Sequence, residues 1–223
     1  MANEDERKFR LTTMPAPSLL GKPVRLTAVY MPMPLPSTST VEMEVTRESG
    51  TPQLILSLDG ESATFDMTEH EAVFNVLETR LNGDSEPELE FRLRREDDDL
   101  IITFKLKEVA LGSRPEANLK ANDHPQIFEA LWLCHVDNPT IKDRFPVTDF
   151  IEGAGDDDDG VVYVDQYLEE LSGLVLAERE FPESSAMAAW QPPEWMTSLD
   201  LKEVTGLKPY KNRSLARDGM PKE

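Results

Sequence analysis

Charged and apolar residues alternate along eight short segments of this chain, and the alternation predicts β-strands. In the segment LIITFKL, Ile102, Phe104 and Leu106 fall on one face and Lys105 on the other, because successive side chains of a strand point to opposite faces. One such strand also fits a sheet with one face in water, so function has to be read from several strands together. The predicted strands cover residues 3–11, 23–31, 88–96, 99–108, 114–121, 140–148, 161–168 and 173–181.

Acidic residues with strand spacing mark the first and the last of these segments. Glu4 and Glu6 share one face of the first predicted strand with Lys8, and Glu178 and Glu180 share one face of the last. If the two strands are neighbours in a sheet, these four carboxylates converge. The pattern therefore indicates a site to which both ends of the chain contribute.

Basic residues with the same spacing occupy the strands in between. The segments ELEFRLRRE, LIITFKL, SRPEANL and TIKDRF carry Arg92, Arg94, Lys105, Arg114, Lys142 and Arg144. A barrel with a charged interior and an apolar exterior covered by helices needs this inverted arrangement. Counter-charges, water or a ligand must then compensate the like charges inside. The predicted fold class is α+β, built on an eight-stranded antiparallel β-barrel.

The order of these motifs resembles that of the CYTH family, the triphosphate tunnel metalloenzymes. The segments ERKF, RLR, TFK, SRPE, KDRF, VDQY, GLVLAERE and EVTGLKPYKNRSLA follow the family's order and span residues 1–31 and 88–217. The last segment is especially similar to bacterial members. The resemblance implies a single domain over residues 1–223, with a tunnel that binds a triphosphate through basic side chains and a divalent metal through acidic ones.

The resemblance also implies roles for individual residues. The triphosphate would be bound by Lys8, Arg92, Arg94, Lys105, Arg114, Lys142 and Arg144. Mg²⁺ or Mn²⁺, which prefer oxygen ligands, would be bound by Glu4, Glu6, Glu178 and Glu180, with Glu116 and Asp165 as further ligands. The catalytic group would comprise Lys8, Lys105, Glu178 and Glu180. Asn118 stands where the family usually has another acid.

Three functions agree with these residues. The first is metal-dependent hydrolysis of inorganic triphosphate or of a nucleoside triphosphate, a reaction in which positioning and charge neutralisation supply most of the catalysis. The second is cyclisation with release of pyrophosphate, as in the class IV adenylyl cyclases that resemble this family. The third is a module that binds a triphosphate or a partner without catalysis. Retention of nearly every charged position favours an enzyme, since an abandoned cluster of like charges is costly.

Residues 32–87 are an insertion relative to the family pattern. They predict three strands, in TVEMEVTRE, PQLILSLDG and ESATFDM, followed by a helix over Thr68–Leu81. Thr68 with Glu71 has the spacing of a capping box, which would begin that helix. The insertion thus has a β-β-β-α order.

The same β-β-β-α order also describes residues 88–136. The insertion is therefore either a β-α element added at the surface, which chains tolerate well, or a degenerate repeat of residues 88–136. In a repeat, the first copy would have lost its basic residues. Glu44, Thr46 and Ser57 would stand in place of Arg92, Arg94 and Lys105.

Two further regions complete the predicted fold. A helix is expected over His124–Val136, with Asp123 as its N-cap and an inward face formed by Ile127, Phe128, Leu131 and either Leu133 or Cys134. Residues 182–217 hold four prolines and two tryptophans. They predict a segment that packs over the strands instead of forming a long helix.

Composition limits the partners and the compartment. A net charge of −20 argues against nucleic acid, whose phosphates would be repelled. The single cysteine, Cys134, fits a reducing compartment and is expected in the core. Since neither a signal-peptide pattern nor a membrane-spanning apolar run is found in the sequence, a cytoplasmic protein with no membrane partner is expected. Assembly as a homodimer is left open.

Overall fold

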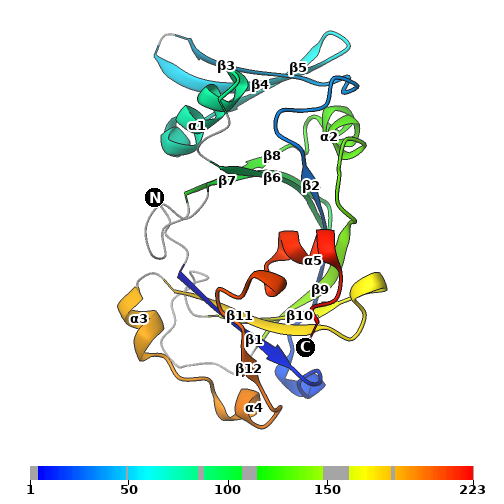
Figure 1. The fold of residues 1–223 in the computed structure, drawn as a ribbon, viewed down its shortest axis with the longest axis vertical. Coiled ribbons are helices and arrows are strands. Elements are labelled where there is room, and N and C mark those ends of the chain that lie inside the picture. The colour runs from blue at the N-terminus through cyan, green and yellow to red at the C-terminus, as the bar shows by residue number, and fades with distance from the viewer. Residues whose placement is uncertain are drawn as a thin grey trace. The chain divides into compact units, whose positions relative to one another are not determined.

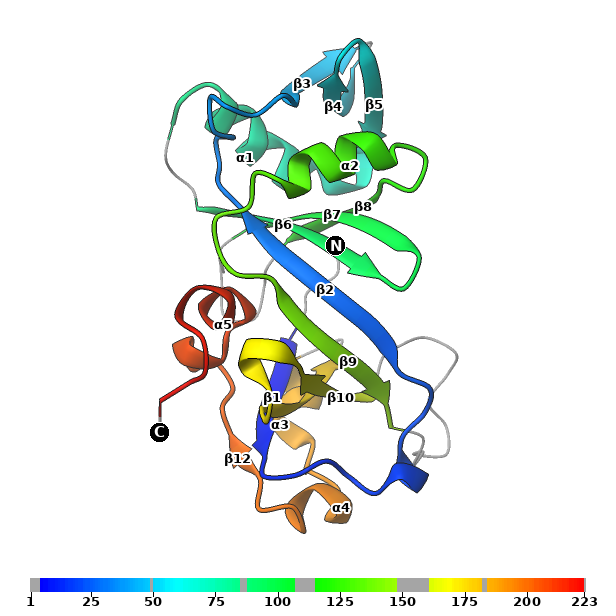
Figure 2. The same cartoon turned by 90° about the vertical axis from the view of Figure 1, so that its right-hand side faces the viewer.

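The chain forms two compact units (Figures 1 and 2). The computed structural model describes residues 5–48, 50–84, 88–106, 115–147, 161–181 and 184–222. The middle unit comprises Ala28–Pro139, and the terminal unit comprises Asn3–Thr27 together with Thr140–Glu223. Strand β2 (Val24–Met31) runs from the terminal unit into the middle unit.

An antiparallel sheet forms the centre of the terminal unit. Its strands follow the order β12-β1-β11-β10-β9, and each neighbouring pair is antiparallel. The first and the last of the predicted barrel strands, β1 and β11, are therefore direct neighbours, as convergence of their carboxylates requires. The strands are β1 (Asp5–Leu11), β9 (Thr140–Pro146), β10 (Val162–Tyr167), β11 (Val175–Phe181) and β12 (Lys202–Glu203).

The segment after β11 covers both faces of this sheet with short elements (Figure 1). On the apolar face, Phe9 and Ala177 pack against Trp190 and Met196. On the other face, Leu215 packs at one end of the sheet with Tyr167. The described part of residues 182–217 thus packs over the strands without forming a long helix, as predicted. The helices are α3 (Ser184–Ala189), α4 (Glu194–Thr197) and α5 (Asn212–Asp218).

The middle unit contains two antiparallel layers, β3-β4-β5 and β6-β7-β8, with α1 and α2 between them (Figure 2). Leu54 of the first layer, Phe104 of the second, and Phe74 and Phe128 of the helices lie in one core. Its elements are β3 (Glu42–Glu48), β4 (Thr51–Leu58), β5 (Glu61–Asp66), α1 (Glu71–Leu81), β6 (Leu89–Glu96), β7 (Asp99–Leu106), β8 (Glu116–Lys120) and α2 (Pro125–Trp132).

Every strand predicted from the alternation is present, so the α+β class is confirmed, as is antiparallel pairing within each unit. Closure into a barrel stays a prediction. In the described part of the chain, no helix has the length and apolar character needed to cross a bilayer. Short 3₁₀ helices complete the chain: η1 (Pro17–Leu19), η2 (Thr68–His70), η3 (Glu169–Leu171) and η4 (Lys208–Tyr210).

The predicted capping box is wrong. The Thr68 backbone N–H and hydroxyl both donate to Asp66 Oδ1, at 2.8 and 2.5 Å, so Thr68 is engaged by the residue two positions before it. Aspartate competes well for such local hydrogen bonds. Residues 68–70 form η2, and α1 begins at Glu71 without a side-chain cap.

The helix predicted over His124–Val136 is shorter than expected. α2 begins at Pro125, a residue suited to the first turn, and its N-cap position is His124 rather than Asp123. It ends at Trp132, so Leu133 is 83% exposed instead of facing inward. The predicted inward residues Ile127, Phe128 and Leu131 are buried, and Cys134 is half-buried against the core.

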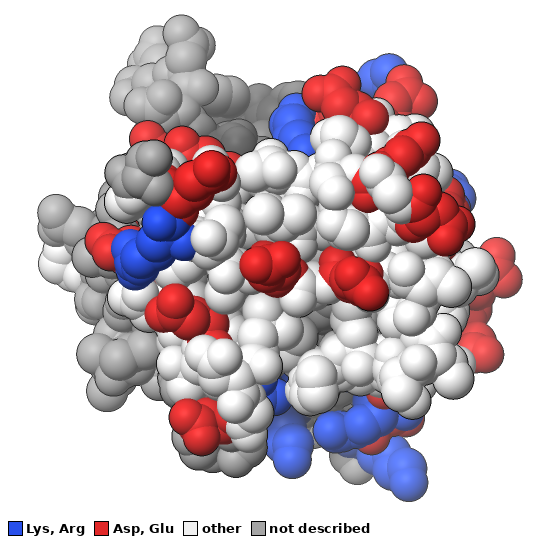
Figure 3. All heavy atoms as spheres, turned by 90° about the horizontal axis from the view of Figure 1, so that it is seen from above, with Lys and Arg blue, Asp and Glu red and all other residues white. Residues whose placement is uncertain are grey.

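The register supports a repeat within the middle unit. Glu44 pairs with Ile55 in β3-β4, and Arg92 pairs with Thr103 in β6-β7, which is the pairing expected for an offset of 48 residues. The face of the β3-β4-β5 layer seen in Figure 3 is broad, largely uncharged and partly acidic. The register and the scarcity of basic residues on this face both favour the proposal that residues 32–87 are a degenerate copy of residues 88–136.

Candidate functional site

Two cross-strand pairs bring acidic and basic residues together on the polar face of the terminal sheet. Lys8 of β1 lies opposite Glu178 of β11, and Glu6 lies opposite Glu180. Residues directly opposite in an antiparallel pair point to the same face. Three of the four predicted converging carboxylates therefore share one face, whereas Glu4 lies outside the described residues.

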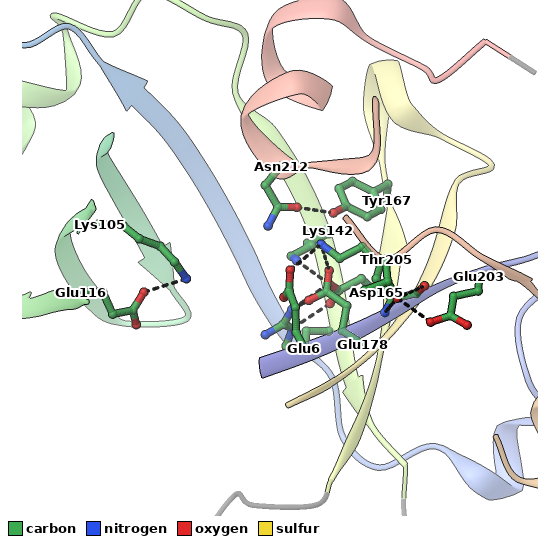
Figure 4. Close-up of polar contacts among 12 residues, drawn as sticks. Glu6, Lys105, Glu116, Lys142, Asp165, Tyr167, Glu178, Glu203, Thr205 and Asn212 are labelled. Carbon is green, nitrogen blue, oxygen red and sulfur yellow. Dashed lines mark hydrogen bonds and ion pairs between the residues drawn. The ribbon is translucent and has the colours of Figure 1, made fainter. Parts of the chain in front are cut away.

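Strands β9 and β10 add to this face a buried carboxylate and two cations (Figure 4). Arg144 donates to both oxygens of Asp165 at 2.8 Å, and Lys142 also donates to Asp165. Arg144 further donates to Glu178 Oε2 at 2.6 Å, and Lys8 Nζ lies 3.0 Å from Glu178 Oε1. These five residues form one ion-pair network across four strands, which we call the terminal cluster.

The terminal cluster is withdrawn from water. Asp165 is fully buried, and the side chains of Lys8 and Glu178 are each 7% exposed. Burial raises the pKa of Glu178, but the nearby Lys8, Lys142 and Arg144 outweigh burial and hold that pKa well below its usual value. Burial and the charge of Arg144 lower the pKa of Lys142. Buried ions are tolerated only when they are paired, so each member depends on the others.

Acid is expected to destabilise the protein through Glu178. The pKa of this carboxyl is lower in the folded state than its usual 4.5, so its ionised form stabilises the fold above about pH 4.5, and that stabilisation is lost as the pH falls below this value. We expect the thermal midpoint of the wild type to fall more steeply between about pH 4.5 and pH 2 than that of Glu178→Gln. Parallel curves, measured by circular dichroism, would contradict the depressed pKa.

Two tyrosines that the sequence reasoning did not single out frame the terminal cluster. The Tyr163 ring centre lies 5.2 Å from Arg144 Cζ, and the Tyr167 ring centre lies 5.4 Å from Lys142 Nζ. Aromatic faces attract such cations. Tyr167 also donates its hydroxyl proton to Asn212 of α5, at 2.7 Å. Because both tyrosines alternate with the buried acid in VYVDQY, strand spacing was the signal that identifies them.

Three carboxylates in and beside the terminal cluster fit a hard divalent metal by their chemistry. Glu6, Glu178 and Glu180 offer oxygen ligands from adjoining strands, the ligands that Mg²⁺ and Mn²⁺ prefer. Glu6 and Glu180 are like charges directly opposite each other, an arrangement that a nearby cation would stabilise. Among the described residues, no group of three or more acidic, histidine or cysteine side chains is close enough together to hold a metal ion. The metal site stays a prediction.

The remaining predicted substrate residues belong to the middle unit. By the strand register, Arg92, Arg94 and Lys105 share the polar face of β6 and β7. Lys105 Nζ lies 3.1 Å from Glu116 Oε2 (Figure 4), and Arg94 is ion-paired with Glu96. Arg114, the other predicted cation, lies outside the described residues.

The described site residues thus fall into two groups, each gathered on the polar face of the strands of its own unit. The two further metal ligands predicted from the sequence, Asp165 and Glu116, both contact basic side chains in the structure. Their part in metal binding stays a prediction. Contacts of this kind limit the orientations open to the cations beside them.

Comparison with solved structures shows likenesses over most of the chain. Two structures of one protein, NE1496, each have 24% sequence identity to this chain. One, described as the inorganic triphosphatase NE1496, covers 97% of this chain and 95% of its own with a TM-score of 0.49. The other, described as a hypothetical protein, covers 96% of each chain with a TM-score of 0.47.

A third likeness is weaker. The Hippeastrum protein HpAC1, whose description combines adenylyl cyclase with a dominant triphosphatase activity, has 12% identity and a TM-score of 0.36, covering 83% of this chain and 82% of its own. No protein-family model and no curated protein matches the chain. With TM-scores below 0.5, these likenesses leave function to be argued from the residues of the site.

Proposed function

We propose that this chain is a triphosphatase that uses Mg²⁺ or Mn²⁺ to hydrolyse inorganic triphosphate or a nucleoside triphosphate. The observation that carries the proposal is the terminal cluster, in which the buried Lys8 and Lys142 and the half-buried Arg144 lie on one face of the sheet with Asp165 and Glu178. Apolar residues of similar volume often stabilise a fold as well as such a buried network does. A polyanionic substrate gives the network a function.

The basic side chains of the terminal cluster suit a triphosphate. Arg144 has the planar guanidinium that binds phosphate oxygens in a bidentate manner, and Lys8 and Lys142 supply compact positive charges. Because Asp165 contacts both Lys142 and Arg144, these side chains are oriented before a substrate arrives, which lowers the entropic cost of binding. Oriented cations also stabilise the charge on a transferring phosphoryl group.

The proposed metal ligands are Glu4, Glu6, Glu178 and Glu180, with Asp165 and Glu116 as further ligands. A divalent cation bound there would neutralise phosphate charge and lower the pKa of a water molecule. The chain itself orients the substrate through Lys8 and the other basic residues. The ion pairs of Glu178 with Lys8 and Arg144 connect the proposed metal ligands to the proposed phosphate-binding groups.

The resemblance of the ordered motifs to the CYTH family agrees with this proposal. We infer that residues 1–223 form one CYTH-like domain, that residues 32–87 are an insertion in it, and that the substrate is a small molecule carrying a triphosphate. The single cysteine and the net charge of −20 support a cytoplasmic protein that does not bind nucleic acid.

The products distinguish hydrolysis from cyclisation and from simple binding. The purified protein is incubated with inorganic triphosphate or ATP in the presence of Mg²⁺, Mn²⁺ or EDTA. We expect release of phosphate from at least one of the two substrates with metal and none with EDTA. Pyrophosphate with cyclic AMP from ATP would identify a cyclase instead. Binding of triphosphate with no turnover of either compound would identify a receptor.

A further inference from the structure

A chain of polar contacts crosses strands β7 and β8 in the middle unit. The Thr103 hydroxyl donates to Asn118 Oδ1 at 2.8 Å, and Asn118 Nδ2 donates to Glu116 Oε1 at 2.7 Å. The other oxygen of Glu116 lies 3.1 Å from Lys105 Nζ. Thr103 is 1% exposed, and the side chains of Glu116 and Lys105 are 14% and 15% exposed. Asn118, which joins them, is exposed, so the two ends of this chain of contacts are withdrawn from water and its middle faces solvent.

The chemistry of the partners fixes the orientation of the Asn118 amide. A carboxylate only accepts hydrogen bonds, so the atom of Asn118 that faces Glu116 must be the Nδ2 donor. The Oδ1 atom then faces Thr103, whose hydroxyl can donate. Both polar atoms of Asn118 are thus used within the protein, and one oxygen of Glu116 is held away from Lys105.

We propose that Asn118 is a positioning residue that turns a single Glu116 oxygen toward Lys105 and so orients Lys105 for an anionic substrate. The proposal rests on the triphosphate-binding function proposed above. It gives Glu116 the role of a counter-ion beside its proposed role as a metal ligand, and it makes the middle unit able to bind phosphate without a metal. Holding a long, flexible lysine in place before binding reduces the side-chain entropy that binding must remove.

Aspartate at position 118 would have the opposite effect. It would have nearly the same shape as asparagine, but it would set a second carboxylate 2.7 Å from Glu116, where the amide nitrogen now lies. Two carboxylates so close need a proton or a cation between them, and such a pair is a ligand set for a hard divalent metal. The amide at position 118 therefore lets Glu116 pair with Lys105 without needing a metal ion between two carboxylates.

The test is direct binding of inorganic triphosphate, measured by isothermal titration calorimetry in EDTA. We expect Asn118→Ala to weaken binding by about three- to ten-fold and Thr103→Val by about three-fold, the range for the net loss of about one ordinary hydrogen bond. Thr103→Ser, which keeps the hydroxyl, should bind within about two-fold of the wild type. Asn118→Asp should bind most weakly in EDTA and recover in part when Mn²⁺ is added.

Kinetics give a second readout of the same proposal. If the product assay finds hydrolysis, Asn118→Ala should raise KM by the factor lost in binding while kcat stays within about two-fold, since a group that acts equally on bound substrate and transition state changes KM alone. The matched control is Thr46→Val, the same kind of change on β3 of the same unit, in the layer that does not carry Lys105, Glu116 or Asn118. It should alter neither affinity nor KM.

Each outcome separates this inference from the proposed function. Wild-type binding of triphosphate in EDTA with unchanged affinity in Asn118→Ala and Thr103→Val would overturn the positioning role and leave the proposed function standing. Wild-type binding only with metal would overturn metal-independent binding. A fall in kcat without a change in KM would place Asn118 in the chemical step and also overturn the inference. Wild-type binding in neither buffer would contradict the proposed function itself.

Discussion

The Glu178→Gln variant is expected to lose triphosphate hydrolysis by at least about 100-fold, the loss typical when a metal site or its support is altered. Glu178 contacts both Lys8 and Arg144 in the terminal cluster, and it is a proposed metal ligand. The amide keeps the shape of the side chain but removes the charge on which both contacts depend. The measurement is the rate of phosphate release at saturating Mg²⁺.

The matched control for this change is Glu203→Gln. Glu203 lies on β12, is ion-paired with Arg7, and has a side chain that is 44% exposed. The substitution therefore makes the same chemical change outside the terminal cluster. We expect its activity to stay within about two-fold of the wild type, because exposed ion pairs contribute little. Unfolding curves for both variants show whether any loss of activity comes from unfolding. Full activity in folded Glu178→Gln would contradict the proposed role of this residue.

The largest effect on stability is expected for Asp165→Asn. This change leaves the buried Lys142 and the half-buried Arg144 without the carboxylate that both contact, and breaking a buried pair by removing one partner costs about 3–5 kcal/mol. We expect the free energy of unfolding to fall by this amount in urea denaturation at neutral pH. Neighbouring Glu178 offsets only part of the loss, since it already contacts Lys8 and Arg144.

Asp143→Asn is the control for Asp165→Asn. Asp143 lies on the same strand as Arg144 and pairs with Arg25, whose side chain is 56% exposed. Exposed pairs of this kind contribute about 0–1 kcal/mol, so the loss should be no more than that. Equal losses in the two variants would mean that the terminal cluster is not buried as described.

The composition of the strand faces could be predicted from the sequence because side chains alternate along a strand with a period of two. Lys8 and Glu178 were placed on charged faces from spacing alone, and the register confirms that they face each other. Their adjacency could not come from spacing, because strand order depends on contacts between residues far apart in the chain. The order was suggested by the resemblance of the motifs.

Helix ends were predicted less well because they depend on competition between local hydrogen bonds. Asp66 takes the Thr68 hydroxyl and amide that a capping box would have used. Apolar residues continue past Trp132, yet α2 ends there and leaves Leu133 in water. A run of apolar residues indicates burial only while the backbone keeps its helical period.

The charge pattern of the sequence also does not predict the contacts that neutral side chains make in the site. The sequence shows Asn118 as the loss of an acid, whereas the structure shows its amide holding Glu116. Tyr163 likewise reads as an ordinary strand residue until its ring is seen beside Arg144. Such roles follow from distances between side chains, which a single sequence does not contain.

The most direct test of the central claim is the rate of phosphate release from inorganic triphosphate and from ATP as the Mg²⁺ concentration is raised from zero. The proposed mechanism predicts no release in EDTA, and a rate with at least one of these substrates that rises with Mg²⁺ to saturation in the wild type and stays near zero in Glu178→Gln. Release that is independent of metal, or no release from either compound at any concentration of Mg²⁺ or Mn²⁺, would contradict a metal-dependent triphosphatase.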